Sequence, residues 1–420
     1  MAHDTGKSLL CNLFDVAVTS AKPDAVLANF LPEKPATGRV AVVAAGKAAA
    51  AMAAALEEVW GACEGLALTR YGHAVPTKSI EVIEAAHPVP DEAGRIAAGR
   101  ILDLASSLTE GDTLVTLISG GASALLSRGA GVISLEEKAE LTRALLASGA
   151  GIGEMNTVRR HISAIKGGRL AAAAYPARCL TFAISDVPGD QPEIIGSGPT
   201  VADPTTQAQA KAILAKYRIG VPASIQSVLE DPAFESPKPG DESLSRTGFH
   251  MIATPQMALE AAKAAAPLPC HLLGDAIEGE AREVGRAFAG LARAVKEGKS
   301  AFTAPCLLLS GGETTVTLPR GASGRGGRNV EWLMGFAEGI AGIGGISAVA
   351  GDTDGVDGAA EVAGAYADST TADRARAAGY NLDEAMAAYD GHGFFEKLGD
   401  QIITGPTNTN VNDFRAILIR

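Results

Sequence analysis

Three short segments of the sequence combine glycine with residues that could bind a phosphate group. Gly46 and Lys47 follow a β-branched run and open a helix, so Lys47 adds a positive charge to a helix start that already attracts anions. Two other segments share a Ser-Gly-Gly pattern, in which glycines let backbone N–H groups approach a phosphate and serines add hydroxyl donors. A plain tight turn explains either of these two segments equally well when it is taken alone. The candidate residues are Ser119, Gly120, Gly121 and Ser123 in the first half of the chain and Ser310, Gly311, Gly312 and Glu313 in the second.

Acidic turns after apolar runs could hold a metal ion. The turn S-D-V-P-G-D carries Asp190, and the turn G-D-T-D-G-V-D-G carries Asp354. Because Mg²⁺ is usually held by one or two carboxylates together with substrate phosphates, we expect both aspartates to position Mg²⁺. An ordinary Asp-rich turn is the structural alternative. An EF-hand is excluded, since Val356 stands where an oxygen ligand is required and Ala363 replaces the terminal glutamate.

Two arginines and two polar loops complete the set of candidate residues. The segment G-R-G-G-R-N places Arg325 and Arg328 among glycines before a helix. Glycine lowers helix stability, so glycines beside arginines at a helix start are expected only where the backbone must come close to a ligand. This segment therefore favours an anion clamp. Ser197 lies in the loop G-S-G-P-T, and Asn410 lies in a polar loop before the last strand. We expect these residues to bind substrate or nucleotide.

Several familiar motifs are absent from the sequence. The G-K-S triplets at 6–8 and 298–300 lack the leading glycine of a phosphate-binding P-loop, and no G-x-G-x-x-G dinucleotide fingerprint is present. His73, His87 and His161 do not have metal-ligand spacing. The five cysteines are widely spaced without C-x-x-C, which is typical of reduced thiols in a cytoplasmic protein.

Charge and hydropathy limit the classes of partner. The 420 residues carry a formal net charge of −12 without a basic block, which argues against nucleic acid as a partner. The N-terminus lacks the pattern of a signal peptide, and no apolar run of about 20 residues predicts a membrane span. Hydrophobic residues make up 47% of the chain, so a sizeable core is expected.

The elements that must position these residues alternate between strand-like and helix-like segments. This alternation predicts parallel sheets with helices on both faces, and ligands of such sheets bind beyond the carboxyl ends of the strands. The stretch 231–248, rich in Pro, Ser, Asp and Gly, predicts a linker, so we expect one domain at 1–235 and a second at 236–420. The expected strands are 39–46, 66–69, 80–85, 113–119, 180–185, 306–310, 346–350 and 415–419, and the expected helices are 47–60, 91–104, 136–147, 278–296 and 331–340.

Taken together, the motifs resemble the bacterial glycerate 2-kinase family, which also carries the name of a tartrate-degradation protein once called hydroxypyruvate reductase. The resemblance runs from about residue 8 to the C-terminus. It rests on Lys47 after a strand and, in chain order, on Y-G-H-A-V-P-T, A-A-H-P-V-P-D-E-A-G, L-I-S-G-G-A-S-A-L-L, N-T-V-R-R-H-I-S-A-I-K-G-G-R-L-A, S-D-V-P-G-D, G-S-G-P-T, L-L-S-G-G-E-T-T-V-T, G-R-G-G-R-N, D-T-D-G-V-D-G and T-G-P-T-N-T-N-V-N-D.

The resemblance implies a fold and an activity. The fold would be two α/β/α sandwich domains, an N-terminal Rossmann-like parallel sheet and a second α/β domain with a mixed sheet, with the active site in the interdomain cleft. The activity would be phosphorylation of D-glycerate at the 2-hydroxyl, with ATP and Mg²⁺ as cofactors. The resemblance gives catalytic weight to Lys47, Asp190, Arg328 and Asp354.

Two other functions stay open. An NAD(P)H-dependent hydroxypyruvate reductase is disfavoured because the dinucleotide fingerprint is missing. A non-catalytic sugar-phosphate or hydroxy-acid sensor would not need two acidic turns together with Lys47. Phosphoryl transfer needs positioning and charge neutralisation, which cations, carboxylates and glycine loops supply. The oligomeric state, including a homo-oligomer, is not set by these residues.

Overall fold

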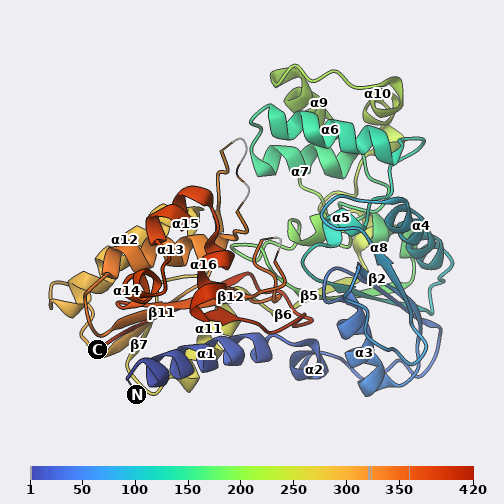
Figure 1. Ribbon diagram of the computed structural model, residues 1–420. Coiled ribbons are helices and arrows are strands. Elements are labelled where there is room, and N and C mark those ends of the chain that lie inside the picture. Colours follow the sequence, from blue (N-terminus) through green and yellow to red (C-terminus); the bar gives the residue numbers. More distant parts are fainter. Residues whose placement is uncertain (1, 320–321, 323, 359) are drawn as a thin grey trace. The chain divides into compact units, whose positions relative to one another are not determined.

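The chain forms two compact units (Figure 1). The first unit is Pro23–Ile252, and the second unit combines the segment up to Lys22 with Ala253–Arg420. The computed structural model describes residues 2–319, 322, 324–358 and 360–420.

The first unit is built on a six-stranded sheet with the order β3-β2-β1-β4-β5-β6. Its strands are β1 (Val40–Ala45), β2 (Glu64–Arg70), β3 (Glu81–Ala85), β4 (Thr113–Ile118), β5 (Arg178–Ile184) and β6 (Thr247–Ala253). The pairs that join β3 to β5 are all parallel. β4 is buried at every position, as expected for a sheet that is covered on both faces.

Helices cover both faces of this first sheet. Figure 1 shows α3 on one side and α4 and α8 on the other. Asp91 caps α4 because its Oδ1 accepts from the Gly94 N–H at 3.0 Å, which confirms the predicted helix start. The helical segments around the sheet are α2 (Pro23–Val26), η1 (Leu27–Asn29), α3 (Ala49–Trp60), α4 (Glu92–Ser106), α5 (Ala122–Leu125), α8 (Arg169–Ala174), η2 (Ile195–Ser197), η3 (Pro232–Phe234) and η4 (Glu242–Leu244).

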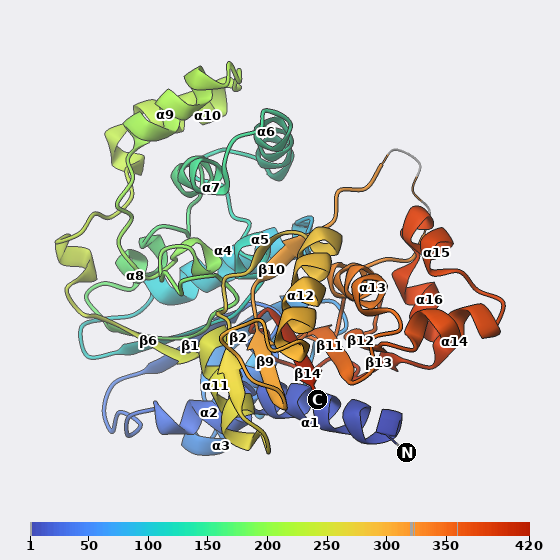
Figure 2. The same cartoon turned by 90° about the vertical axis from the view of Figure 1, so that its left-hand side faces the viewer.

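Four more helices of the first unit form a group with a small core of its own, which we call the helical cap. They are α6 (Leu135–Ala147), α7 (Ile152–His161), α9 (Gln207–Lys216) and α10 (Ala223–Glu230). Leu145, Val158, Leu214 and Ile225 are buried between them. Figures 1 and 2 both show the cap on the side of α5 that faces away from the first sheet.

The second unit contains a mixed six-stranded sheet with the order β13-β12-β11-β14-β9-β7. Only the β7–β9 pair is parallel among the described strand pairs of this sheet. A separate parallel pair joins β8 to β10. The strands are β7 (Cys270–Leu272), β8 (Glu278–Glu280), β9 (Cys306–Ser310), β10 (Glu313–Thr315), β11 (Ile346–Asp352), β12 (Gly364–Asp368), β13 (Gln401–Ile402) and β14 (Asp413–Ile419).

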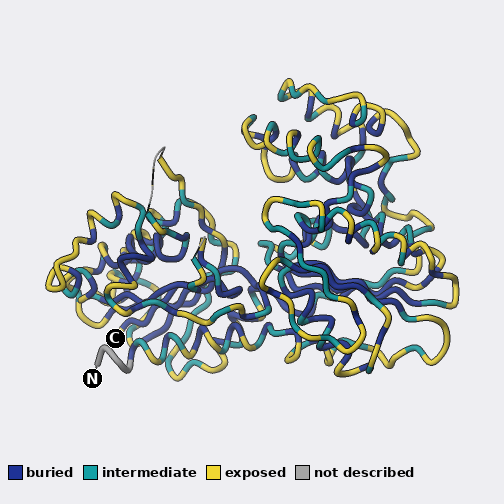
Figure 3. Tube along the Cα trace, turned by 45° about the vertical axis from the view of Figure 1, so that its right-hand side comes forward, coloured by how far each residue is buried: buried dark blue, intermediate teal, exposed yellow. Residues whose placement is uncertain are grey.

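The helices of the second unit also lie on both faces of its sheet (Figure 1). Figure 3 shows buried residues gathered in the interior of each unit. Trp332 and Phe336 of α13 stack at 5.0 Å within the core on one face. Phe14 of α1 meets Phe414 edge-on at 6.0 Å on the other. The helices are α1 (Ala2–Ser20), α11 (Pro255–Ala265), α12 (Ala281–Lys296), α13 (Arg328–Ile340), α14 (Thr371–Ala377), α15 (Leu382–Ala388) and α16 (Gly391–Leu398).

The α/β fold class with a parallel and a mixed sheet is confirmed, but the division of the chain differs from the predicted 1–235 and 236–420. Residues beyond 235 stay in the first unit because β6 extends its sheet beside β5. The first helix belongs to the second unit because its apolar face, including Phe14, packs on that sheet. No helix among the described residues has the length and apolar character needed to cross a bilayer.

Candidate functional site

Two predicted loops meet at the carboxyl edge of the first sheet, where β1 and β4 end side by side. The Lys47 N–H donates to the Gly120 carbonyl at 2.8 Å, and the Ala48 N–H donates to Ser119 Oγ at 3.0 Å. Gly46 has a φ of 130°, and a Cβ on it would lie 2.2 Å from Ser119 Oγ. Only glycine therefore lets the two loops come this close. The structure brings these predicted residues together.

The side chain of Lys47 lies against the Ser-Gly-Gly loop. Gly121 has a left-handed φ of 85°, and a Cβ on it would lie 3.4 Å from Lys47 Cγ and 3.0 Å from His87 Nε2. The Lys47 carbonyl accepts from Thr69 Oγ1 at 3.2 Å and lies 3.3 Å from His73 Nδ1. His73 therefore adjoins the Lys47 backbone and His87 adjoins Gly121, although the scattered positions of the two histidines in the sequence had no functional interpretation.

Ser123 and Ser197 are also brought together, with their Oγ atoms 2.8 Å apart. Lys166 Nζ donates to the Ser123 carbonyl at 2.7 Å and to its Oγ at 3.0 Å. Ser197 and Asp190 have left-handed φ angles of 64° and 50°, which are uncommon for residues other than glycine. Asp190 lies half-buried on the turn that follows β5, the neighbour of β4.

In the second unit, Arg328 is the centre of an acidic cluster, which we call the Arg328 cluster. Its Nε donates to Asp413 Oδ1 and its Nη2 to Asp352 Oδ2, both at 2.8 Å, and its Nη1 donates to Glu313 Oε1. Nη2 also lies 3.3 Å from Asn412 Oδ1. Burial alone would lower the pKa of the guanidinium, but the Asp413, Asp352 and Glu313 carboxylates raise it overall. Arg328 therefore stays charged and holds three carboxylates in place.

The register of the second sheet explains why this cluster forms. Asp352 at the end of β11 pairs with Asp413 at the start of β14. Arg415, fully buried two residue pairs away, donates to Asp413 Oδ2 at 2.6 Å and to the Gly311 carbonyl at 2.9 Å. Asp413 is thus shared between two arginines. Its position at the end of the predicted polar loop did not reveal this role.

The second Ser-Gly-Gly segment borders the same cluster. Ser310 ends β9, next to β14, and its register partner is Arg415. Gly312 has a φ of 106°, and its carbonyl accepts from the Asp413 N–H at 3.3 Å. Glu313 therefore contacts Arg328 directly, and Gly311 and Gly312 border the cluster through their carbonyls, which accept from Arg415 and from the Asp413 N–H.

Asp354 lies on the loop that follows β11, and Asp357 of the same loop holds the start of α13. Asp354 is 1% exposed, and its Oδ1 accepts from the Val356 N–H at 2.8 Å. Asp357 accepts from the N–H groups of Asn329 and Val330, both at 3.0 Å. Burial raises the pKa of Asp357. This loop therefore fixes the helix start that carries Arg328.

Arg325 and Asn410 are placed differently from the other candidates of the second unit. Arg325 is 62% exposed and forms an ion pair with Glu396 of α16, outside the Arg328 cluster. Asn410 is 5% exposed, and its Oδ1 accepts from the Asn412 N–H at 3.2 Å. Asn410 thus supports the loop that leads into the cluster.

No group of three or more His, Cys, Asp or Glu side chains within the described ranges is arranged to hold a metal ion. Asp190 belongs to the first unit and Asp354 to the second. Each could supply one carboxylate to a metal that takes its remaining ligands from phosphate and water.

Comparison with known proteins identifies the family. The family model described as "Domain of unknown function (DUF4147)" matches residues 9–230, and the MOFRL family model matches residues 306–413. A Thermotoga maritima protein named D-glycerate 2-kinase is 38% identical over 97% of this chain and 97% of its own length. The chain belongs to the glycerate 2-kinase family.

Other similar proteins match nearly the whole chain. A crystal structure of glycerate kinase from Thermotoga maritima matches with a TM-score of 0.90 and 37% identity, covering 99% of this chain and 100% of that chain. An Agrobacterium vitis protein named "Putative hydroxypyruvate reductase" is 50% identical over 99% of this chain and 95% of its own length. The glycerate 2-kinase family thus includes proteins with two kinds of name, and its two-domain α/β fold is shared by this chain.

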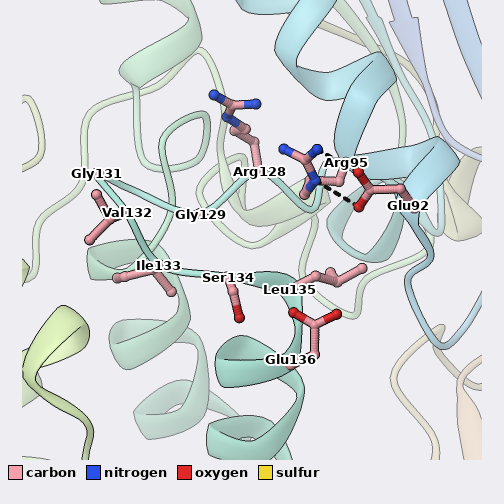
Figure 4. Close-up of a pocket in the computed structure, with 10 residues that line it drawn as sticks. All are labelled: Glu92, Arg95, Arg128, Gly129, Gly131, Val132, Ile133, Ser134, Leu135 and Glu136. Atoms are coloured by element: carbon pink, nitrogen blue, oxygen red, sulfur yellow. Dashed lines mark hydrogen bonds and ion pairs between the residues drawn. The ribbon is translucent and has the colours of Figure 1, made fainter.

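Among the cavities in the first unit of this family member, two differ in their charged lining. The smaller, of about 240 Å³, is lined by Glu92 and Arg95 of α4 and by residues within 128–136. Within it, Arg95 donates to Glu92 at 2.7 and 2.5 Å (Figure 4). The larger, of about 560 Å³, reaches His87, Gly121 and Ser123 and is therefore continuous with the Lys47 loops. No charged residue of the larger cavity was predicted from the sequence.

Proposed function

We propose that this chain is an ATP-dependent kinase that phosphorylates D-glycerate at the 2-hydroxyl to give 2-phosphoglycerate and ADP. The observation that carries this proposal is the 38% identity to a D-glycerate 2-kinase over nearly the full length of both chains. The residue types at the two sheet edges support it, because phosphoryl transfer depends on positioning and electrostatic stabilisation.

Lys47 would supply a positive charge to the substrate carboxylate or to the transferring phosphoryl group. Its side chain lies against Gly121, where a Cβ would fill the space beside His87 and the lysine stem. Glycine at this position leaves backbone accessible to an oxyanion, which fits a phosphate or a carboxylate. The hydrogen bonds of the Lys47 backbone to the neighbouring loops would keep its charge in place before substrate binds.

Arg328 would act from the second unit, where it holds Glu313, Asp352 and Asp413. A forked guanidinium can hold two oxygens at once, so it could stabilise charge on the γ-phosphoryl group or keep the carboxylates ordered. Because three carboxylates surround one guanidinium, the cluster carries a negative charge.

Mg²⁺ would neutralise charge on the nucleotide phosphates when bound. The donor set fits this ion, since Asp190 and Asp354 offer hard carboxylate oxygens on loops that follow buried strands. Asp354 is held by the Val356 N–H, and Asp190 by the left-handed turn on which it lies. We propose that Asp190 or Asp354 helps to position Mg²⁺.

The name of the Agrobacterium vitis relative makes reduction of hydroxypyruvate the second candidate. The kinase is favoured because the dinucleotide fingerprint is missing from the sequence. The loop after β1 is instead occupied by Gly46 and Lys47 packed against Ser119.

A substrate panel tests the proposal. The chain is incubated with ATP and Mg²⁺ plus D-glycerate, with L-glycerate as the matched control, and ADP release is followed. A parallel sample contains NADH or NADPH with hydroxypyruvate. We expect ADP release that depends on D-glycerate and no oxidation of the reduced cofactor. Oxidation with hydroxypyruvate and no ADP release would replace the kinase by the reductase.

A further inference from the structure

The larger cavity of the first unit has two chemically different sides. It lies between α6 and α7 of the helical cap, residues 87–90, and the segment from Gly121 to Ser127. One side is apolar and includes Leu135, Ala139 and Ile162. Val89 and Leu146, which also line it, are 71% and 58% exposed. Such exposed apolar side chains beside a cavity are typical of a wall that a ligand covers.

The other side of the cavity is cationic. Lys138, Arg143, Arg159 and Lys166 line it, and no aspartate or glutamate is among its described lining residues. Lys138 Nζ donates to the carbonyls of Ser127 at 2.7 Å and Arg128 at 3.3 Å, and Lys166 Nζ donates to the carbonyl and Oγ of Ser123. None of the four cations forms an ion pair with a carboxylate in the part of the chain that the structure describes. In the smaller cavity, by contrast, the guanidinium of Arg95 is neutralised by Glu92 (Figure 4).

Burial lowers the pKa of three of these cations, as it does for charges that lack a counterion. It lowers the pKa of Lys138 to about 7 and that of Arg159 in the same direction. Burial also lowers the pKa of Lys166, and the charges of Lys138 and Arg159 lower it further. The other titratable groups that line the cavity with Lys138 are His87 and Arg143, so no carboxylate there offsets the repulsion. A bound anion would relieve it.

The cavity also leads to the residues proposed for catalysis. Lys166 binds Ser123, and Gly121 lies between the cavity and the side chain of Lys47. A polyphosphate held by the cationic side would therefore have one end at the Ser-Gly-Gly loop. A volume of about 560 Å³ is within the range of small-molecule sites.

We propose that this cavity is the nucleotide site of the chain, with the polyphosphate bound by Lys138, Arg159 and Lys166 and the base against the apolar wall that includes Val89 and Leu146. The proposal rests on the proposed kinase function and assigns the nucleotide to the first unit. Free inorganic polyphosphate shares the anionic chemistry but would not use the apolar wall.

Calorimetry tests this assignment. It measures how the full chain, without glycerate, binds the non-hydrolysable ATP analogue AMP-PNP in the presence of Mg²⁺. Lys138→Met and Arg159→Met should each weaken binding by about 10- to 100-fold, the value of a lost hydrogen bond to a charged group. Lys211→Met, on an exposed position of α9 outside the cavity lining, is the matched control and should bind like the parent chain. Thermal unfolding checks that the variants fold, and removal of a buried charge should leave their Tm unchanged or higher.

The apolar wall needs its own measurement. Leu146→Ser should weaken binding of AMP-PNP but not of tripolyphosphate. Unchanged AMP-PNP binding in folded Lys138→Met and Arg159→Met would overturn the assignment. Equal binding of AMP-PNP and tripolyphosphate, unaffected by Leu146→Ser, would also overturn it in favour of a phosphate-only site.

These outcomes are separable from those of the proposed function. A chain that binds AMP-PNP through Lys138 but never phosphorylates glycerate would contradict the kinase and support the nucleotide site. A chain that turns over ATP and D-glycerate with an unchanged KM for ATP in Lys138→Met and Arg159→Met would contradict the nucleotide site alone.

Discussion

Arg328→Lys keeps a positive charge in the second unit but removes the fork that binds three carboxylates. In the structure each guanidinium nitrogen has its own acidic partner: Nε holds Asp413, Nη2 holds Asp352 and Nη1 holds Glu313. Asp413 and Asp352 are 0% and 6% exposed, so water cannot replace the arginine for either. A single ammonium group can approach only part of this set.

The magnitude follows from the bonds that are lost. A hydrogen bond between charged groups contributes about 1.5–3 kcal/mol net. Loss of at least one bond to a buried carboxylate should therefore lower the free energy of unfolding by about 1.5–3 kcal/mol. If the same geometry is needed at the transition state, a similar loss there corresponds to a decrease in kcat of about 10- to 100-fold.

Urea unfolding and kcat with saturating ATP and D-glycerate are measured on the same preparations. Arg325→Lys is the matched control from the same glycine-rich segment, because Arg325 makes an exposed ion pair with Glu396, and such pairs contribute little. A folded Arg328→Lys with parental kcat and unfolding free energy would refute the reasoning. A larger loss in Arg325→Lys would show that the other arginine is the functional one.

Four further outcomes are expected. Lys47→Ala should lower kcat/KM by about 100- to 1,000-fold with the unfolding free energy unchanged, and near-parental activity in a folded variant would remove Lys47 from the mechanism. Gly46→Ala places a Cβ 2.2 Å from Ser119 Oγ, so urea unfolding should show a loss of about 1–3 kcal/mol, and an unchanged midpoint would contradict the close approach. Excess EDTA should abolish ADP release and added Mg²⁺ should restore it, whereas full activity in EDTA would exclude a metal. The pKa of Lys138 is about 7, and a bound anion favours its protonated form, so calorimetry should show the affinity for AMP-PNP falling as pH rises above about 7. If Lys138→Met kept the same dependence of affinity on pH, another group would be responsible for it.

The strand-end loops could be predicted because one topological rule places them. Parallel neighbours end at the same edge, so Lys47 after β1 and Ser119 after β4 had to be close once both runs were recognised as buried strands. This rule does not cover Ser310–Glu313 in the second sheet, because β9 and β14 are antiparallel and the end of β9 lies beside the start of β14. Their roles in catalysis remain predictions.

Other features depend on contacts that no local pattern encodes. The pairing of Asp352 with Asp413 follows from an antiparallel register between strands separated by most of the C-terminal segment. Lys138 lies on α6 and Lys166 follows α7, and the sequence pattern of neither helix marks these lysines. Only the packing of the cap over the Ser123 loop brings them to one cavity. The first helix gave no signal of which sheet its apolar face covers.

The central claim is that the chain transfers a phosphoryl group to the 2-hydroxyl of D-glycerate, and the product itself tests it most directly. Phosphorus NMR of a reaction with ATP, Mg²⁺ and D-glycerate distinguishes 2-phosphoglycerate from 3-phosphoglycerate, with authentic samples of both added in turn. We predict that the 2-phosphoglycerate signal grows as the γ-phosphate signal of ATP declines, and that enolase then consumes the product without a mutase. A product that coincides with 3-phosphoglycerate would contradict the position of transfer, and an unchanged ATP spectrum in the presence of D-glycerate would contradict the kinase.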